Sequence, residues 1–222
     1  EEDIVENVLL KCLAAAEKFN VDCEVLAVIN GSKDRTGDII NSLAKQYPKI
    51  KPVLVKENLG YGFGITTGLS HAKSPVIGYV DGDGQVPLED VFLQYQYMKS
   101  KDLAFCKAIR KYRGDGIVRL CASFGYNLLY RIVFGINVVD INAKPKLFKK
   151  SVYDEINLSS KDWFIDAEII LLLFHKGYKV DETFEVYFND REEGKSNVRF
   201  STVLEFVKNL LHWRLKLWNI KT

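Results

Sequence analysis

The stretch Tyr79-Val80-Asp81-Gly82-Asp83-Gly84-Gln85 decides how the rest of the chain is interpreted. It completes the apolar run Val76 to Val80, which predicts a buried strand, and it places two carboxylates one residue apart where that strand ends. Open α/β sheets bind ligands beyond the carboxyl ends of their strands. Two adjacent carboxylates repel each other, and a hard divalent cation that also binds phosphate oxygens removes that cost. Taken alone, the motif is more typical of an ordinary polar turn than of a metal site, because Asp and Gly are common turn residues.

Two earlier segments repeat this pattern of an apolar run followed by small and polar residues. Cys23 to Ile29 precedes Asn30-Gly31-Ser32-Lys33-Asp34-Arg35-Thr36, and Pro52 to Val55 precedes Asn58-Leu59-Gly60-Tyr61-Gly62. Helices are predicted between these strands, and the alternation predicts an α/β fold with a mainly parallel sheet covered by helices on both faces. The three strand ends therefore converge on one edge of the sheet. The glycine cluster itself is more typical of a tight strand-to-helix turn than of a phosphate cradle.

The remaining segments are assigned from their apolar periodicity. Helices are predicted over Glu1 to Phe19, from the early turn through Tyr47, over Gly60 to Ala72, from Pro87 onward, over residues 117–134, over Phe164 to Lys176 and over Thr202 to Trp218. Extended segments are predicted at Leu103 to Lys107, Asn137 to Val139, Lys146 to Phe148 and Tyr178 to Phe188, with a charged loop at Asp190 to Asn197. A doubly wound domain normally opens with a buried strand. None precedes the first helix here, so we expect the first strand to be missing from this chain.

Composition narrows the class of protein. A chain of 222 residues that is 47% hydrophobic is the right size for one domain with a sizeable core. The formal net charge of +2 gives no argument for nucleic acid as a partner. The four cysteines form no CxxC pair and no zinc-ligand spacing, so they are interpreted as small buried side chains in a reducing compartment. We find no signal peptide and no charge-free apolar run long enough to span a bilayer.

The segments at the three strand ends together resemble family 2 glycosyltransferases, which have a GT-A fold. That family carries a "DDGSxDxT" turn, an "NxGxxxAxxxG" helix start and a "DADxQ" motif followed by proline. The matching segments here are Ile29 to Thr36, Asn58 to Gly68 and Asp81 to Pro87. Glu1 and Glu2 look like the end of the family's opening "PxYNEE". The resemblance covers nearly the whole chain, and it implies a single GT-A domain.

The second half of the chain resembles the branch of dolichyl-phosphate mannose and glucose synthases. The residues that carry this likeness are Arg110, Arg119, Ser123, Asn127, Asp140, Lys146 to Lys150, Asp166-Ala167-Glu168, Gly177 to Val180 and Arg191-Glu192-Glu193-Gly194-Lys195-Ser196. The last segment is similar to the "RxxGxSK" loop of those synthases. The resemblance divides the domain, residues 1–198, into a nucleotide-sugar half over residues 1–107 and an acceptor half over residues 108–198.

The resemblance implies an inverting, metal-dependent transfer of a hexose from a nucleotide sugar, of the GDP-mannose or UDP-glucose type, to a polyprenyl (dolichyl-type) phosphate. The residues implied for the nucleotide sugar are Asn30, Ser32, Asp34, Asn58, Gly60, Asp81 and Asp83, and those implied for Mg²⁺ or Mn²⁺ are Asp81, Asp83 and Gln85. The residues implied for the acceptor phosphate are Arg110, Arg119, Ser123, Arg131, Arg191 and Lys195. Those implied in catalysis are Asp83, Asp166, Arg191 and Lys195.

Three departures from the family pattern bear on these roles. The first two positions of the early turn are Ile29 and Asn30, which removes carboxylates expected near the base. The "SGF" before the later strand is replaced by Ala143-Lys144-Pro145, which adds a cation that we expect near the acceptor side. The "GxSK" ending lacks its final lysine, and Lys195 is the candidate to substitute for it.

The last helix, residues 199–222, is basic and amphipathic. Apolar residues at helical spacing share it with Lys208, His212, Arg214 and Lys216, and Trp213 and Trp218 lie among them. This pattern is typical of a helix in a membrane interface, and it is equally typical of a helix packed on its own domain. A lipid-linked acceptor favours the first interpretation, so we expect a cytoplasmic protein that is peripheral at the cytoplasmic face of a membrane.

Alternatives remain for individual residues and for the activity. Arg131 also fits a surface residue that extends to solvent, and Arg110 also fits a solvated basic loop. Asp166 and Glu168 lie two apart on a helix and cannot face each other, so one is expected to face the site and the other to cap or pair. A family 2 transferase that extends a polysaccharide on a sugar hydroxyl would need a base, most plausibly Asp166. A GT-A domain that only binds nucleotide or lipid is the non-catalytic alternative.

Overall fold

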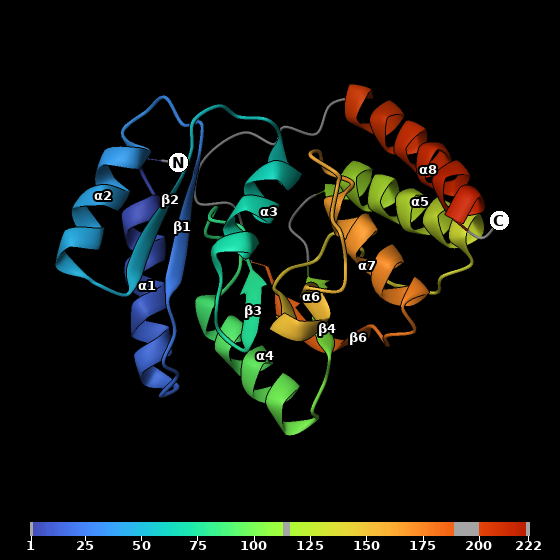
Figure 1. Cartoon of the computed structure of the whole chain (residues 1–222). Helices are drawn as coiled ribbons and strands as arrows, with labels where there is room; N and C mark the ends of the chain where they lie inside the picture. The colour runs from blue at the N-terminus through green and yellow to red at the C-terminus, as the bar shows by residue number, and fades with distance from the viewer. Residues whose placement is uncertain (1, 113–115, 189–199, 221–222) are drawn as a thin grey trace.

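The structure is a computed structural model that describes residues 2–112, 116–188 and 200–220 (Figure 1). Its helices are α1 (Val5–Lys18), α2 (Thr36–Gln46), α3 (Tyr61–His71), α4 (Leu88–Ser100), α5 (Gly116–Phe134), α6 (Lys150–Tyr153), α7 (Ile165–His175) and α8 (Phe200–Ile220). Its strands are β1 (Val25–Asn30), β2 (Ile50–Val55), β3 (Val76–Tyr79), β4 (Phe105–Tyr112), β5 (Lys146–Lys149) and β6 (Asp181–Tyr187). The predicted α/β architecture is confirmed.

The strands form two hydrogen-bonded ladders. β1 pairs in parallel with β2, and a second ladder has the order β3-β5-β4-β6. β5 is antiparallel to both β3 and β4, whereas β4 and β6 are parallel, so β3, β4 and β6 point the same way. Helix α3 packs against strands of both ladders and bridges them.

The antiparallel strand β5 places a lysine at the centre of the second ladder. Lys146 is the register partner of Tyr79 on β3 and of Lys107 on β4. Residues directly opposite each other in a ladder share a face of the sheet, and like charges there destabilise the pairing. Lys107 and Lys146 are both fully buried, so each requires its own compensating partners.

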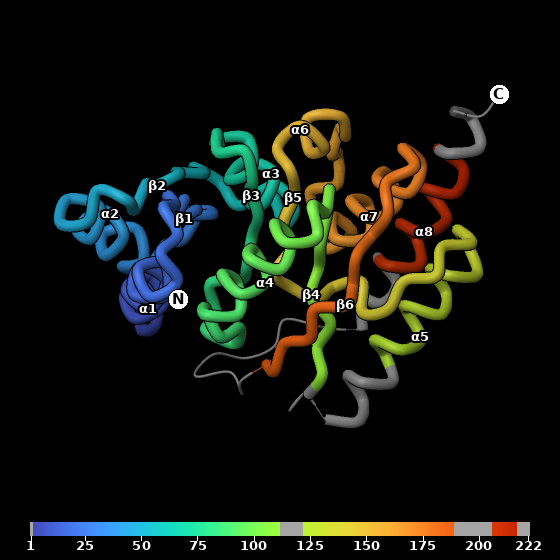
Figure 2. The backbone as a smooth tube through the Cα atoms, turned by 90° about the horizontal axis from the view of Figure 1, so that it is seen from below, coloured from blue at the N-terminus to red at the C-terminus, as the bar shows by residue number. Residues whose placement is uncertain are grey.

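Helix α7 forms the middle of the core. Its residues from Ile165 to Leu171 are all buried, because the helix is apolar on nearly every side and packs both on the sheet and on other helices. On one side it contacts Phe105 and Phe148 of the ladder. On the other it joins a cluster with Tyr130 of α5 and Trp213 of α8. Figure 2 shows α5 and α8 side by side at one end of the molecule, with α1 and α2 at the opposite end.

The elements agree with their predicted positions except in the middle of the chain. β4 continues to Tyr112, beyond the predicted end at Lys107, because it pairs with β6 as well as with β5. The predicted extended segment Asn137 to Val139 pairs with no described strand, and its Val139 amide donates instead to the Glu182 carboxylate at 3.1 Å. The short helix α6 was not predicted, because four residues carry no recognisable period. The predicted loop at Asp190 to Asn197 lies outside the described residues.

Candidate active site

The turns after β1 and β2 meet through Asn30, Asn58 and Gly60. The Asn30 side chain donates to the Gly60 carbonyl at 3.1 Å, and the Asn58 side chain accepts from the Gly60 amide at 3.0 Å. The side-chain oxygen of Asn30 is buried and has no hydrogen-bond partner among the described residues, so it can accept from a ligand. Ser32 is exposed, and Asp34 is exposed and accepts from the Thr36 amide at 3.2 Å where α2 begins.

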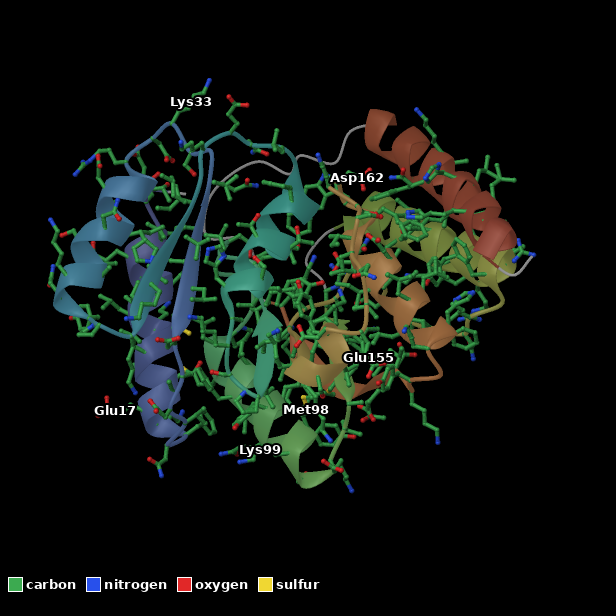
Figure 3. All side chains as sticks on the ribbon, viewed as in Figure 1. Glu17, Lys33, Met98, Lys99, Glu155 and Asp162 are labelled. Carbon is green, nitrogen blue, oxygen red and sulfur yellow. The ribbon has the colours of Figure 1, made fainter. Side chains whose placement is uncertain are left out.

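The glycines at the start of α3 allow a close approach to the loop before α7. Gly60 has a φ of +119°, and a Cβ there would lie 2.2 Å from the Lys161 carbonyl oxygen. A Cβ on Gly62 would lie 2.6 Å from the Ser160 carbonyl oxygen. These contacts support the interpretation as a tight turn rather than a phosphate cradle. Figure 3 shows Lys33 and Asp162 toward the upper edge of the molecule, and Glu17 and Lys99 at the lower edge.

Asp81 lies just beyond β3, and both of its carboxylate oxygens have partners. The Tyr61 hydroxyl donates to Oδ1 at 2.6 Å, and the Lys144 ammonium lies 3.4 Å from Oδ2. The ring of Tyr61 stacks on Trp163 with centroids 4.2 Å apart. The Asp81 side chain remains 29% exposed, whereas that of Lys144 is 5% exposed. Lys144 therefore lies behind Asp81 and beside Asp166, and its predicted place near the acceptor stays a prediction.

Asp166 is the centre of this group of charges. Its carboxylate is 1% exposed, lies 3.1 Å from the Lys144 ammonium and also pairs with Lys146. The Tyr79 hydroxyl donates to it at 2.6 Å. We call Asp81, Lys144, Lys146 and Asp166 the Asp166 cluster. With two carboxylates and two ammonium groups, it is electrically balanced when all four are ionised.

The cluster shifts the pKa values of its members. Burial alone would raise the pKa of Asp166, but Lys144 and Lys146 outweigh burial and lower it to about 2. Burial alone would lower the pKa of Lys144, but Asp166 and Asp81 hold it above its ordinary value. Burial dominates at Lys146, with the charge of Lys144 adding to it, and its pKa falls to about 7 although Asp166 opposes the shift. A buried carboxylate held ionised by two lysines is not presented to an acceptor, so its predicted role as a general base does not fit its surroundings.

The three residues predicted to bind Mg²⁺ or Mn²⁺ are only partly arranged for it. Asp83 Oδ1 accepts from the Gln85 amide at 3.1 Å, which fixes the turn. Asp81 is engaged by Tyr61 and Lys144, and an ammonium beside a carboxylate opposes a second cation there. Among the described residues, no three His, Cys, Asp or Glu side chains gather as a metal site would require. The donor set therefore does not fit a cation held by both aspartates.

Arg110, predicted to bind the acceptor phosphate, is paired within the protein. Its Nε donates to Asp140 Oδ2 at 2.8 Å, and a second guanidinium nitrogen pairs with Oδ1. Both side chains are only 9% exposed. The buried ammonium of Lys107 nearby donates to the Val139 carbonyl at 2.6 Å and lies 3.2 Å from Glu182. We call Lys107, Arg110, Asp140 and Glu182 the Asp140 cluster. Asp140 already balances the charge of Arg110, which gives Arg110 a structural role, and its contact with the acceptor phosphate stays a prediction.

The other predicted acceptor residues are divided between described and undescribed parts of the chain. Ser123 is half-buried and Arg131 is exposed, both on α5. The side chain of Arg119 and the residues Arg191 and Lys195 lie outside what the structure describes.

The loop before α7 connects the site to helix α8 through hydrogen bonds. Glu168 is buried and accepts from the Ser159 and Ser160 amides, each at 2.7 Å. Glu168 is thus the residue of the Asp166–Glu168 pair that caps, whereas Asp166 faces the site. Asn209 of α8 donates to Asp162 at 2.8 Å. The site residues that sequence reasoning missed are Tyr61 and Trp163. The sequence signal for Tyr61 was an aromatic within the glycine-rich helix start, whereas Trp163 lies in the loop before α7 and has no such signal.

Comparison with known proteins gives consistent relatives. The model of the family described as Glycosyl transferase family 2 matches residues 1–156. The chain is 24% identical over 217 residues to a dolichyl-phosphate beta-glucosyltransferase of Trichomonas vaginalis, covering 91% of this chain and 66% of that protein. It is 24% identical over 213 residues to an undecaprenyl-phosphate 4-deoxy-4-formamido-L-arabinose transferase of Pectobacterium atrosepticum, covering 95% of this chain and 63% of that protein. The chain thus spans somewhat less than two thirds of the length of these relatives.

Solved structures share the fold. A mannosyl-3-phosphoglycerate synthase from Rubrobacter xylanophilus superposes with a TM-score of 0.70 at 18% identity, covering 98% of this chain and 71% of that one. A glucosyl-3-phosphoglycerate synthase from Mycobacterium tuberculosis, crystallised with Mn²⁺, UDP and its product, gives 0.69 at 14% identity, covering 96% and 76%. These likenesses confirm the predicted GT-A fold. Because the family model matches well over half of its residues, the chain belongs to glycosyl transferase family 2.

Proposed function

We propose that this protein transfers a hexose from a nucleotide sugar to a polyprenyl phosphate at a membrane surface, with inversion at the anomeric carbon. One observation carries the proposal. Relatives that align with 91% and 95% of the chain are named for transfer to two different polyprenyl phosphates, dolichyl and undecaprenyl. The acceptor headgroup common to both is the chemistry that this chain would recognise.

The donor side is supported by the converging turns. Asn30, Asn58 and Gly60 are joined by hydrogen bonds, and Asp81 is linked to the same turn through Tyr61 at the start of α3. In an open α/β sheet this edge is where a nucleotide binds. The unsatisfied oxygen of Asn30 offers an acceptor for a base or ribose donor group. Ser32, Asp34 and Asp83 complete the proposed nucleotide-sugar set.

The acceptor is proposed to be a phosphate because Asp166, the residue expected to act as a base, is buried and paired. A hydroxyl acceptor must lose a proton to a positioned base during transfer. A phosphate monoester has a second pKa of about 6 and is largely dianionic near neutrality, so it attacks without one. Asp166, the base that a polysaccharide-extending enzyme would use, is buried between two lysines. We propose Arg119, Arg191 and Lys195 as the cations that bind the acceptor phosphate.

A membrane surface is proposed on the outer sides of α5 and α8. The two helices pack on each other, and each exposes an apolar stripe at helical spacing. The stripe consists of Phe124, Leu128 and Ile132 on α5 and of Val207, Leu211 and Leu215 on α8. The opposite side of α8 is packed inside, with Trp213 4% exposed. Arg131 and Arg214 are exposed on these same helices, as expected where a helix meets anionic lipid. Among the described helices, none combines the length and apolarity needed to cross a bilayer.

A divalent cation at this site would have to bind beside the ammonium that already pairs with Asp81. Asp83 and Gln85 remain candidate ligands for Mg²⁺ or Mn²⁺, and a related fold was crystallised with Mn²⁺. Asp81 already has Lys144 as a counter-ion.

The acceptor assignment is tested by comparing two lipids that differ only in phosphate. Purified protein is incubated with radiolabelled UDP-glucose or GDP-mannose and with dolichyl phosphate or dolichol in detergent micelles. We expect label in dolichyl phosphate only, and loss of that signal in Asp83→Ala. Arg191→Ala should reduce the rate about tenfold or more while donor affinity stays near wild type, because charge-assisted hydrogen bonds are worth about 1.5–3 kcal/mol each. Lys176→Ala serves as the control, because Lys176 is exposed and lies just after the C-terminal end of α7. Equal transfer to the free alcohol would reject the phosphate acceptor.

The membrane surface is tested by flotation with vesicles of phosphatidylcholine and phosphatidylserine. Leu211→Asp with Leu215→Asp should reduce binding at least about tenfold, since each buried Leu side chain contributes about 1.5–3 kcal/mol. Leu54→Asp is the matched control, because Leu54 on β2 is 66% exposed and Leu215 is 68% exposed. If the α8 variant and the Leu54 variant bound vesicles equally, the proposal that α8 forms part of the membrane surface would be rejected.

A further inference from the structure

Lys144 stands where the resembled family motif has a glycine, and the fold brings its ammonium to the donor site. The residue lies just before β5, which pairs with β3, and Asp81 lies just after β3. The ammonium is therefore 3.4 Å from Asp81 and 3.1 Å from Asp166. It also lies 5.0 Å above the centre of the Tyr61 ring, whose hydroxyl holds the same aspartate.

The ammonium acts on the site through Asp81 and not by direct contact with a ligand. Lys144 is 5% exposed, whereas Asp81 is 29% exposed and forms the outer surface of the cluster. A ligand at this edge meets a carboxylate whose charge is already balanced from behind. In the absence of Lys144, the Asp166 cluster would hold two carboxylates and one lysine, and its net negative charge would attract a cation to Asp81.

We propose that Lys144 is an internal substitute for the charge of a divalent cation at Asp81, so that the nucleoside diphosphate of the donor binds with little dependence on Mg²⁺ or Mn²⁺. This inference rests on the proposed function, because it assumes a nucleotide-sugar donor at this edge. It assigns Lys144 as a positioning residue: it holds Asp81 in place and removes the repulsion between that carboxylate and the diphosphate. The change from glycine to lysine thereby lowers the need of the Asp81-Gly82-Asp83 motif for a divalent cation.

The geometry opposes a cation shared by both aspartates. A divalent ion bound at Asp81 Oδ2 would approach an ammonium that is 3.4 Å from the same oxygen. Oδ1 would have to exchange the Tyr61 hydroxyl, which donates to it at 2.6 Å. Lys144 cannot withdraw freely, because it is also paired with Asp166 inside the core.

The test measures binding of UDP and GDP by calorimetry, once with Mn²⁺ and once with EDTA. For the wild-type protein we expect one nucleotide to bind with dissociation constants that differ by no more than about threefold between the two buffers. Lys144→Gly and Lys144→Met should both make binding depend on Mn²⁺ by about tenfold or more, because one unit of charge close to a divalent ion is worth at least that much even in a water-like medium. A purely structural role would weaken binding equally in both buffers. Lys149→Met is the matched control: it removes a lysine at the other end of the same segment, whose partner is the exposed Asp102.

A second readout needs no nucleotide. The electron paramagnetic resonance signal of free Mn²⁺ should persist with the wild-type protein. It should decrease with Lys144→Gly, because the carboxylates of Asp81 and Asp166 then lack this ammonium and can attract the ion. Thermal melting of each variant checks that it is folded. Wild-type nucleotide binding that is lost in EDTA overturns the inference while leaving the proposed function intact. Variants that are folded and keep the wild-type ratio of affinities overturn it as well. Absence of UDP and GDP binding in either buffer overturns both the inference and the proposed function.

Discussion

The Asp166 cluster and the Asp140 cluster have similar composition and different surroundings. They adjoin where Lys146 on β5 lies opposite Lys107 on β4. Lys107 donates to the backbone carbonyls of Ala108, Val139 and Asp140 in addition to its carboxylate neighbour. The Asp166 cluster is held almost entirely by side chains, and one of its members, Asp81, reaches the surface. Balanced charge is therefore common to both clusters. Each has one partly exposed carboxylate, Asp81 at 29% and Glu182 at 21%, but only Asp81 lies just beyond β3, at the edge where the donor is proposed to bind.

The largest effect should follow from removing the carboxylate at the centre of the accessible cluster. Asp166→Asn leaves two buried ammonium groups with Asp81 alone, and breaking a buried pair typically costs about 3–5 kcal/mol. We expect a loss of that size in the free energy of unfolding measured with urea at pH 7. Asp154→Asn removes an exposed carboxylate whose partner is the partly exposed i,i−4 neighbour Lys150, and it should change stability by less than about 0.5 kcal/mol. A cost below about 1 kcal/mol for Asp166→Asn would mean that the cluster is not held as tightly as its burial indicates.

A smaller effect is expected in the Asp140 cluster. Lys107→Met leaves buried carbonyls without a donor, which costs about 1–3 kcal/mol, but it also removes a buried charge. Nucleotide affinity should stay at the wild-type value, because this cluster has no part in the donor site. Calorimetry with UDP and GDP on the urea-characterised variant checks both points. If Lys107→Met instead lowered nucleotide affinity without lowering stability, the two clusters would not be independent. They would then be coupled through the facing lysines, Lys107 and Lys146.

The hydroxyl that supports Asp166 offers a finer comparison. Tyr79→Phe removes a hydrogen bond to a buried carboxylate, and such bonds contribute about 1.5–3 kcal/mol. Tyr61→Phe removes the equivalent bond to Asp81, which is 29% exposed, so water can replace it and the loss should be smaller. Urea unfolding of the two variants gives the ratio directly. Equal losses of unfolding free energy would show that water reaches Asp81 no better than it reaches Asp166.

The smallest effect is a dependence on pH. The pKa of Asp166 is lowered to about 2 from an ordinary value of 3.8, mainly by Lys144 and Lys146 against the opposing effect of burial. A depressed carboxyl pKa stabilises the fold above the ordinary value, and this contribution is lost as the pH falls toward 2. We therefore expect the stability difference between wild type and Asp166→Asn to shrink by about 1 kcal/mol between pH 7 and pH 3. Unfolding curves at both pH values test this, and a constant difference would contradict the assigned pKa.

The sequence allowed the elements and the converging strand ends to be predicted, because both depend on local periodicity and on residues adjacent to strands. Asn30, Asn58 and Gly60 are brought together as expected. The pairing of Arg110 with Asp140 could not be foreseen, because the two residues are thirty positions apart and the contact depends on the extension of β4. The local sequence around Arg110 is the same whether the arginine lies in a solvated basic loop or in a buried ion pair, so composition could not distinguish the two.

Lys144 shows most clearly where sequence reasoning ends. Its departure from the family pattern was recognised, and it was assigned to the acceptor side because its neighbours in sequence belong to the acceptor half. The strand that follows it runs antiparallel between β3 and β4. That reversal carries the residue back to the end of β3, and nothing in the local sequence specifies the order of strands in the ladder.

The stack of Tyr61 on Trp163 gives this protein an optical property. The indole ring is 38% exposed and lies with its centroid 4.2 Å from a phenol ring whose hydroxyl is bonded to Asp81. Any ligand that displaces or tightens that hydroxyl alters the polarity and contact of the indole. The fluorescence emission of Trp163 should therefore change when the donor site is filled. The emission of Trp213, a buried residue of α8 that packs against α7, should not change. The chain has three tryptophans, so replacing Trp213 and Trp218 by Phe would leave the emission of Trp163 to report occupancy of the Asp81 site without any attached dye.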